Sequence, residues 1–134
     1  MKNSIAHLPS LKQKELQKIS NLIQQNSSDI EKIILYGSYA RGNYREEKDL
    51  KPDRKSGHVS DYDILIITSK KRLALDASFW SKISKKLQEL NTSASPRILT
   101  IDIEALNIKL AEAQYFYSDI KKEKSFAWQV FISF

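Results

Sequence analysis

Three short apolar runs limit the folds that this 134-residue chain can adopt. Residues 32–36 and 62–68 are rich in isoleucine and leucine, and their length is typical of buried strands. Residues 97–102 form a third run of the same kind. The sequence therefore predicts three strands that pair into a small sheet.

Helical periodicity surrounds these runs. Apolar residues recur every three or four positions in residues 10–25, in a segment that starts near Asp76 or Ser78 and ends near Leu90, and in residues 106–117. The expected order is helix, strand, strand, helix, strand, helix. This alternation favours an α/β (α+β) domain, with a small mixed β-sheet flanked by helices.

The composition fits one folded domain, residues 1–134, and excludes several classes of protein. Hydrophobic residues make up 41% of the chain, which is enough for one core and too little for two enzyme domains. The absence of cysteine excludes a disulfide framework, a thiol nucleophile and a Cys-ligated zinc site. No run approaches the roughly 18 apolar residues of a membrane helix, and the start lacks the apolar segment of a signal peptide. We therefore expect a cytoplasmic protein with no membrane partner.

The chain is basic, with 22 Lys and Arg against 16 Asp and Glu and a formal charge of +6. Such a charge would suit a nucleic acid or a nucleoside triphosphate. The basic residues are scattered along the chain, however, which is typical of a solvated surface. Charge alone therefore supports nucleic-acid binding only weakly.

A glycine–serine turn follows the first predicted strand, in the sequence LYGSYARG at residues 35–42. Gly37 allows a sharp turn and leaves room for a phosphate to approach the backbone. Ser38 offers a hydroxyl and a backbone N–H, and a helix that began here would add further donors. Arg41 could add charge-assisted hydrogen bonds to the same phosphates. The turn is therefore a candidate phosphate-binding site.

Two aspartates, Asp61 and Asp63, lie at the start of the second predicted strand in the sequence SDYDILIIT. Strand alternation puts both carboxylates on one face, with their Cα atoms roughly 6.5–7 Å apart. Tyr62 and Ile64 would then point into the core. Paired carboxylates repel each other unless they hold a cation or a proton, and such oxygen ligands suit Mg²⁺ together with substrate phosphates.

The two motifs together resemble the signature of the polymerase-beta-like nucleotidyltransferase superfamily, in which a Gly-Ser turn precedes an Asp-x-Asp metal-binding pair. The resemblance is closest to the small prokaryotic nucleotidyltransferases called MNT proteins, which are often joined to or paired with a HEPN domain. It extends over about residues 5–123.

The resemblance implies a site and a reaction. Gly37 and Ser38 would bind the β- and γ-phosphates of a nucleoside triphosphate, and Asp61 and Asp63 would hold Mg²⁺ or Mn²⁺ ions. A hydroxyl acceptor would attack the α-phosphate and release pyrophosphate. The transferred group is an NMP, expected to be AMP from ATP.

The superfamily generally uses a third carboxylate, contributed by a later strand, as a general base and metal ligand. Asp102, at the end of RILTID, is the candidate in this chain. An aspartate that immediately precedes a predicted helix is also typical of an N-cap. Both interpretations stay open on the sequence alone.

Two segments depart from the superfamily pattern. Residues 43–60 form a charged insertion, a loop or a hairpin, which we expect to be solvated, with contact to an RNA or protein acceptor as the alternative.

Residues 126–134 form an uncharged aromatic tail that is a candidate final strand. Relatives continue here into an all-helical HEPN domain. We expect that domain to be absent, because the chain is a truncated remnant or because the partner is a separate chain.

Three functions compete. The first is an enzyme that transfers AMP to a hydroxyl, with a Tyr of a HEPN toxin as the expected acceptor, since HEPN-paired relatives are antitoxins of this kind. The second is a non-enzymatic module or antitoxin that keeps the fold and acts by occluding its partner. The third, modification of a cationic antibiotic, usually needs an acidic second domain, which a chain of charge +6 does not offer. A homo-oligomer fits any of these.

Overall fold

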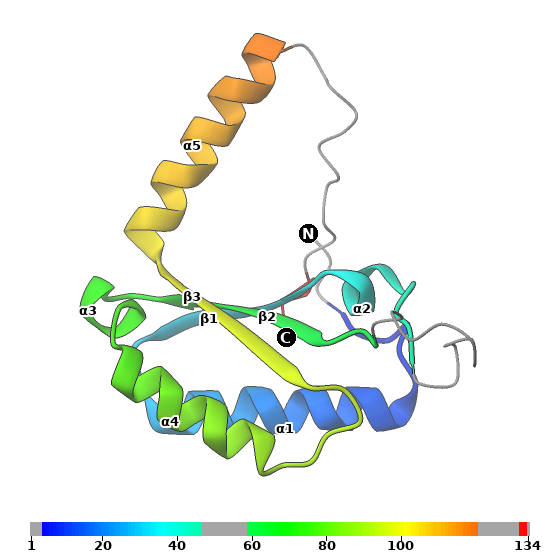
Figure 1. Cartoon of the computed structure of the whole chain (residues 1–134). Coiled ribbons are helices and arrows are strands. Elements are labelled where there is room, and N and C mark those ends of the chain that lie inside the picture. The colour runs from blue at the N-terminus through cyan, green and yellow to red at the C-terminus, as the bar shows by residue number, and fades with distance from the viewer. Residues whose placement is uncertain (1–3, 47–58, 121–131, 134) are drawn as a thin grey trace.

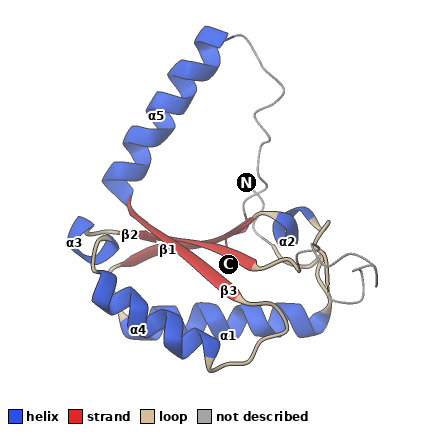
Figure 2. Cartoon of the chain, viewed as in Figure 1, coloured by secondary structure: helices blue, strands red, loops and turns tan. Residues whose placement is uncertain are grey.

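A four-stranded mixed sheet forms the centre of the computed structural model, which describes residues 4–46, 59–120 and 132–133 (Figures 1 and 2). The strand order is β3-β2-β1-β4. Their bounds are β1 (Ile30–Tyr36), β2 (Tyr62–Thr68), β3 (Pro96–Asp102) and β4 (Ile132–Ser133). β1 is antiparallel to β2 and to β4, whereas β2 and β3 are parallel.

Helices lie on both sides of this sheet. α1 (Ser10–Asn26) and α4 (Ala77–Gln88) run side by side under one face (Figure 1). α5 (Ile103–Ile120) leaves the end of β3 and rises on the other side. α2 (Ser38–Arg41) and α3 (Lys71–Ala74) are single turns that follow β1 and β2. No helix within the described ranges is long and apolar enough to cross a membrane.

The structure confirms the predicted fold class and the order of the long elements. The aromatic tail contributes β4, which pairs with β1, but its residues 126–131 and 134 lie outside the described residues. The same holds for residues 47–58 of the charged insertion. At its base, the backbone N–H of Arg45 donates to the Ser60 hydroxyl and the N–H of Ser60 donates to the Arg45 carbonyl, both at 2.8 Å. These two bonds close the insertion next to β2.

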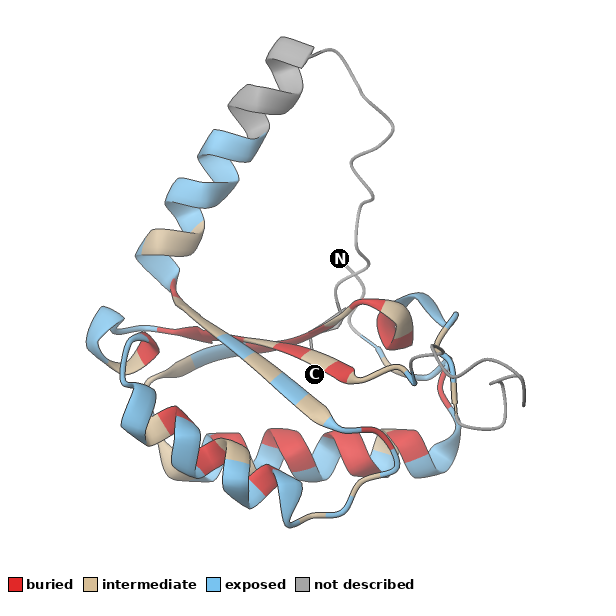
Figure 3. Cartoon of the chain, viewed as in Figure 1, coloured by how far each residue is buried: buried red, intermediate tan, exposed pale blue. Residues whose placement is uncertain are grey.

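The core lies between the sheet and the α1–α4 layer (Figure 3). The predicted apolar stripes of both helices face it, because residues three or four apart fall on one helical face. Asp76 caps α4 by accepting a hydrogen bond from the backbone N–H of Phe79 at 3.0 Å. The buried members from the two helices and the sheet include Leu16, Ile19, Ile23, Ile33, Leu35, Ile64, Ile66, Trp80, Ile83 and Leu87.

A buried polar network connects α1 to β2 and to the loop before β3. Glu15 of α1 accepts hydrogen bonds from the Tyr62 hydroxyl at 2.6 Å and from the backbone N–H of Ser93 at 2.6 Å. Lys12, one turn earlier, donates to the Ser93 hydroxyl at 2.6 Å. Lys12 and Glu15 are only 5% and 8% exposed. Such groups stabilise a fold only while their partners remain, because an unsatisfied buried charge is costly.

Hydrogen bonding controls the ionisation of Glu15. Burial alone would raise the pKa of this carboxyl, but the hydrogen bonds from Ser93 and Tyr62 and the nearby charge of Lys12 bring its pKa below the ordinary value. The folded state therefore favours the carboxylate. Its contribution to stability is present above the unfolded pKa and is lost as the pH falls through the lower folded pKa.

We predict that Glu15→Gln lowers the free energy of unfolding by on the order of 2 kcal/mol at pH 7, because the amide is uncharged and cannot accept all of these bonds. The deficit should shrink at an acidic pH below the lowered pKa of Glu15, where the wild-type carboxylate becomes protonated. Urea unfolding followed by circular dichroism at both pH values measures it. Gln17→Glu, on the exposed side of α1, is the control for a change of charge. A deficit that does not vary with pH would contradict the role of ionised Glu15.

Candidate functional site

The antiparallel register of β1 and β2 brings the two sequence motifs together. Tyr36, the last residue of β1, pairs with Asp63 of β2, so the following Gly37 lies against the Asp63 side chain. Gly37 adopts φ 77° and ψ −155°, a conformation that is essentially restricted to glycine. A Cβ at this position would overlap the Asp63 carboxylate. The glycine is therefore required by backbone geometry and by contact with an acidic side chain.

Aromatic packing holds the turn in place. Ser38 begins α2, and the next residue, Tyr39, is 1% exposed. The Tyr39 ring stacks on Tyr44, with centroids 4.2 Å apart, and packs against Tyr62 at 4.6 Å. His7 also contacts α2 through a hydrogen bond between its Nε2 and the Tyr39 carbonyl at 2.8 Å. These contacts join the Gly-Ser turn to the strand that carries the acidic pair.

Asp61 and Asp63 behave as the alternation predicts. Tyr62 and Ile64 are fully buried, whereas Asp61 and Asp63 are partly exposed on the opposite side. Burial raises the pKa of Asp63, and the like charge of Asp61 raises it further, while Arg97 and Arg41 act in the opposite direction. A carboxylate in such surroundings gains from a neighbouring cation.

Ser38, Asp61 and Asp63 line one cavity of about 520 Å³. The rest of its polar lining is Ser60 and two arginines: Arg45, at the base of the insertion, and Arg97, from β3. The cavity thus combines two serines, two carboxylates and two guanidinium groups. Arginine is well suited to binding phosphate oxygens through paired N–H groups.

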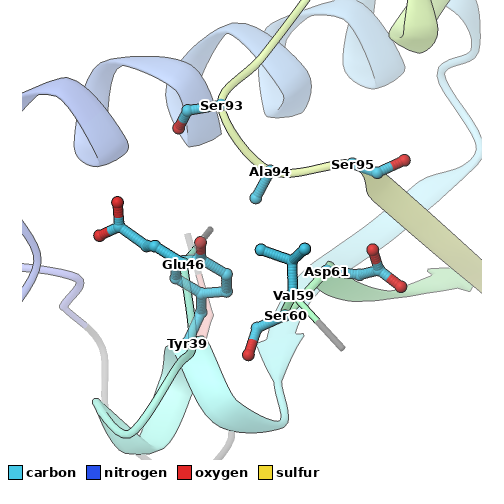
Figure 4. A pocket seen from close by; sticks show the side chains of 8 residues that line it. All are labelled: Tyr39, Glu46, Val59, Ser60, Asp61, Ser93, Ala94 and Ser95. Atoms are coloured by element: carbon cyan, nitrogen blue, oxygen red, sulfur yellow. The ribbon is translucent and has the colours of Figure 1, made fainter. Parts of the chain in front are cut away.

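A second cavity of about 380 Å³ adjoins the first (Figure 4). Asp61 and Ser60 line both cavities. The ring of Tyr39 and the side chains of Glu46 and Ser93 also line the second one. Among the lining residues that the structure describes, none is Lys, Arg or His. The described linings of the two cavities therefore differ in charge, although they share an aspartate.

Arg41, predicted to bind the same phosphates, lies outside the lining of this cavity. Its side chain is exposed and does not line the cavity of Ser38, Asp61 and Asp63, although its charge acts on Asp63. Arg45 and Arg97 line the cavity instead. Arg45 follows the motif closely in sequence, but nothing local marks Arg97. Only knowledge that β3 runs parallel to β2 could have located it.

Asp102 lies far from the acidic pair, and the expectation that it supplies a third catalytic carboxylate is wrong for this structure. In the parallel register Asp102 pairs with Thr68, at the end of β2 opposite to Asp63. These two positions are five residues apart along the strand, or roughly 16 Å. Its carboxylate accepts the backbone N–H of Ala105 at 3.0 Å and so caps α5. Of the two interpretations of Asp102, the N-cap is confirmed.

The donor set fits one divalent ion better than a closed metal site. Among the residues that the structure describes, no group of three or more His, Cys, Asp or Glu could hold a metal ion. Mg²⁺ often binds to proteins through one or two carboxylates, with water and substrate phosphates as the remaining ligands. The mutual repulsion between Asp61 and Asp63 fits this arrangement, because a bound cation would relieve it.

The family described as "Polymerase beta, Nucleotidyltransferase" matches residues 17–125 of the chain. This chain belongs to that family. The match includes both motifs and β3, and it confirms the superfamily that the motifs indicated. Membership supports a transferase activity in general. A search of the curated proteins found no match.

Two solved structures are similar to this chain at low identity. One is a crystal structure of a toxin–antitoxin with AMP-PNP, with 22% identity over 63% of this chain and a TM-score of 0.43. The other is a tri-AMPylated Shewanella oneidensis HEPN toxin in complex with MNT antitoxin, with 20% identity over 69% of this chain and a TM-score of 0.40. The match covers 55% and 56% of those two chains, so this chain corresponds to little more than half of each.

We predict that Gly37→Ala destabilises the protein by on the order of 1–3 kcal/mol, because alanine is strained at this φ and ψ. The new Cβ should also displace Asp63 and weaken the binding of Mn²⁺. Thermal unfolding and isothermal titration with Mn²⁺ measure the two effects. Gly42→Ala is the matched control, since Gly42 also has positive φ, at 88°, but lies against no carboxylate. Equal Mn²⁺ affinity in both variants would contradict the proposed contact.

We predict that Asp102→Ala costs about 1 kcal/mol of stability through loss of the cap, while Asp102→Asn costs much less, since asparagine is also a good N-cap. Both variants should keep wild-type nucleotide affinity, because residue 102 lies at the far end of the sheet. Thermal unfolding and ATP titration test this pair. A loss of ATP affinity in Asp102→Asn would return the residue to the candidate site.

Proposed function

We propose that this protein transfers AMP from ATP to a hydroxyl group on an acceptor. The observation that carries the proposal is the single cavity that Ser38, Asp61 and Asp63 line together. These residues belong to motifs more than 20 positions apart in the sequence, and the pairing of β1 with β2 brings them together. Membership of the nucleotidyltransferase family supports the same reaction class.

The Gly-Ser turn is the proposed binding site for the β- and γ-phosphates. Gly37 allows the sharp turn after β1, with the Asp63 carboxylate filling the space beside it, and the Ser38 hydroxyl lines the cavity. With only four residues, α2 offers first-turn N–H groups but little helix dipole. Arg41, exposed nearby, would add a screened positive charge. Hydrogen bonds and the cationic lining are therefore the main proposed source of phosphate affinity.

Asp61 and Asp63 are the proposed ligands for Mg²⁺ or Mn²⁺. A bound ion would polarise the phosphate and stabilise the leaving pyrophosphate. Asp61 also lines the second cavity, which supports a role for its carboxylate in accepting a hydrogen bond from an acceptor hydroxyl.

The second cavity is the proposed location of the acceptor. The lining residues that the structure describes include no Lys, Arg or His to attract a triphosphate, whereas the Ser95 hydroxyl and the Tyr39 ring would suit a neutral hydroxyl-bearing group. A tyrosine of a helical HEPN partner is the first acceptor to test, and one of the similar solved structures contains an AMPylated HEPN toxin. The choice of this acceptor follows from the resemblance to MNT proteins that are paired with a HEPN domain.

A non-enzymatic antitoxin is the second candidate function. The β3 residues beside the acidic end of β2 are Pro96, Arg97 and Ile98, so β3 supplies no carboxylate there. A nucleotidyltransferase fold that had lost a catalytic carboxylate could still occlude a partner. Measurement of transfer separates this candidate from the enzyme.

We predict that Asp61→Asn and Asp63→Asn each reduce AMP transfer by on the order of 100-fold or more, because each removes a ligand that helps to stabilise charge in the transition state. The assay is Mg²⁺-dependent labelling of the chain or of a co-expressed HEPN protein by ATP labelled at the α-phosphate. Asp76→Asn is the matched control, since it makes the same chemical change at an exposed helix cap.

Thermal unfolding separates lost chemistry from lost structure. Asp63→Asn should not lower the unfolding temperature, since it removes a partly buried charge beside another aspartate. If wild-type protein labels nothing in the presence of Mg²⁺, or if Asp61→Asn and Asp63→Asn together leave labelling intact, the transfer proposal is wrong. If the chain neutralises a co-expressed HEPN toxin without labelling it, the result would favour the non-enzymatic antitoxin that occludes its partner.

A further inference from the structure

The parallel pairing of β2 and β3 puts Arg97 beside the acidic pair, Asp61 and Asp63. In the register of β2 and β3 its Cα partner is Asp63. Neighbouring residues in register point to the same face of a sheet, and both side chains line the cavity that contains Ser38. Arg97 is exposed within that cavity, so its guanidinium is accessible to a ligand.

The described lining of the cavity carries two negative and two positive side chains. The described part of β3 contributes a cation beside Asp63, and its aspartate, Asp102, lies at the distant end. Asp61 and Asp63 together carry enough negative charge to neutralise one divalent ion. Arg97 and Arg45 then supply positive charge that neither carboxylate needs once that ion is bound.

We propose that Arg97 is a phosphate-binding residue of this site. Its guanidinium, carried by β3, would donate hydrogen bonds to the substrate triphosphate in the cavity that Ser38 also lines. The inference rests on the proposed function and identifies a determinant of its substrate affinity. A guanidinium can donate two parallel hydrogen bonds to phosphate oxygens, whereas a lysine ammonium offers a single point charge. Its position on a strand, rather than on a loop, keeps the guanidinium beside the acidic pair.

The rival interpretation makes Arg97 only a counter-ion of Asp63. Its charge does act on that carboxyl group. A counter-ion would compete with a metal ion and would have no preference for ligands with more phosphates. The two roles therefore differ in their effects on phosphate-dependent and metal-dependent binding.

The experiment is isothermal titration of ATP, AMP and inorganic tripolyphosphate, with Mg²⁺ present, into wild type, Arg97→Ala and Arg97→Lys. We expect Arg97→Ala to weaken ATP and tripolyphosphate binding by roughly 10- to 100-fold, as for the loss of charge-assisted hydrogen bonds. AMP binding should change less than threefold, and Arg97→Lys should be intermediate. Arg72→Ala, an exposed arginine on α3, is the matched control. Thermal unfolding of each variant verifies that it is folded.

The outcomes separate this inference from the proposed function. If wild type binds ATP and Arg97→Ala binds it with equal affinity, Arg97 is not a phosphate ligand and the transfer proposal stands. A further titration of Mn²⁺ without nucleotide tests the counter-ion role: tighter Mn²⁺ binding by Arg97→Ala with unchanged ATP affinity would assign that role and overturn the inference. If wild type binds neither ATP nor tripolyphosphate, both proposals fail.

Discussion

The close contact between Gly37 and the Asp63 carboxylate is the constraint on which the candidate site depends. It exists because β1 and β2 pair in a register that sets Tyr36 opposite Asp63. A slip of one residue would turn Asp63 and its neighbours to the other face of the sheet, exchanging them with Tyr62 and Ile64. The core therefore enforces the geometry of the site, since those two residues are fully buried in the correct register.

The second support of the site is polar and comes from α1. Glu15 accepts hydrogen bonds from the Tyr62 hydroxyl and from Ser93, so one buried carboxylate joins the strand of the acidic pair to the loop that lines the second cavity. Tyr39 packs against the same tyrosine ring. Lys12 adds a hydrogen bond to the Ser93 hydroxyl. Buried networks of this kind hold a single arrangement because each broken bond leaves an unsatisfied group.

Strand direction decides which residues of β3 line the candidate site. Because β3 runs parallel to β2, its first residues lie beside Asp63 and its last residue lies at the opposite end of the sheet. An arginine therefore enters the cavity and Asp102 becomes the cap of α5. The proposed site has two carboxylates and two arginines, Arg45 and Arg97. The arginines agree with a substrate rich in negative charge.

The sequence by itself determined the local elements and the chemistry of the motifs. Periodicity and apolar runs located the three long helices and the first three strands, Gly37 marked the turn, and the spacing of Asp61 and Asp63 placed them on one face, since each of these depends on a few neighbouring residues. It left Asp102 undecided and did not indicate Arg97. Tertiary structure decided both, because strand pairing joins residues more than 30 positions apart and no local pattern encodes its register or direction.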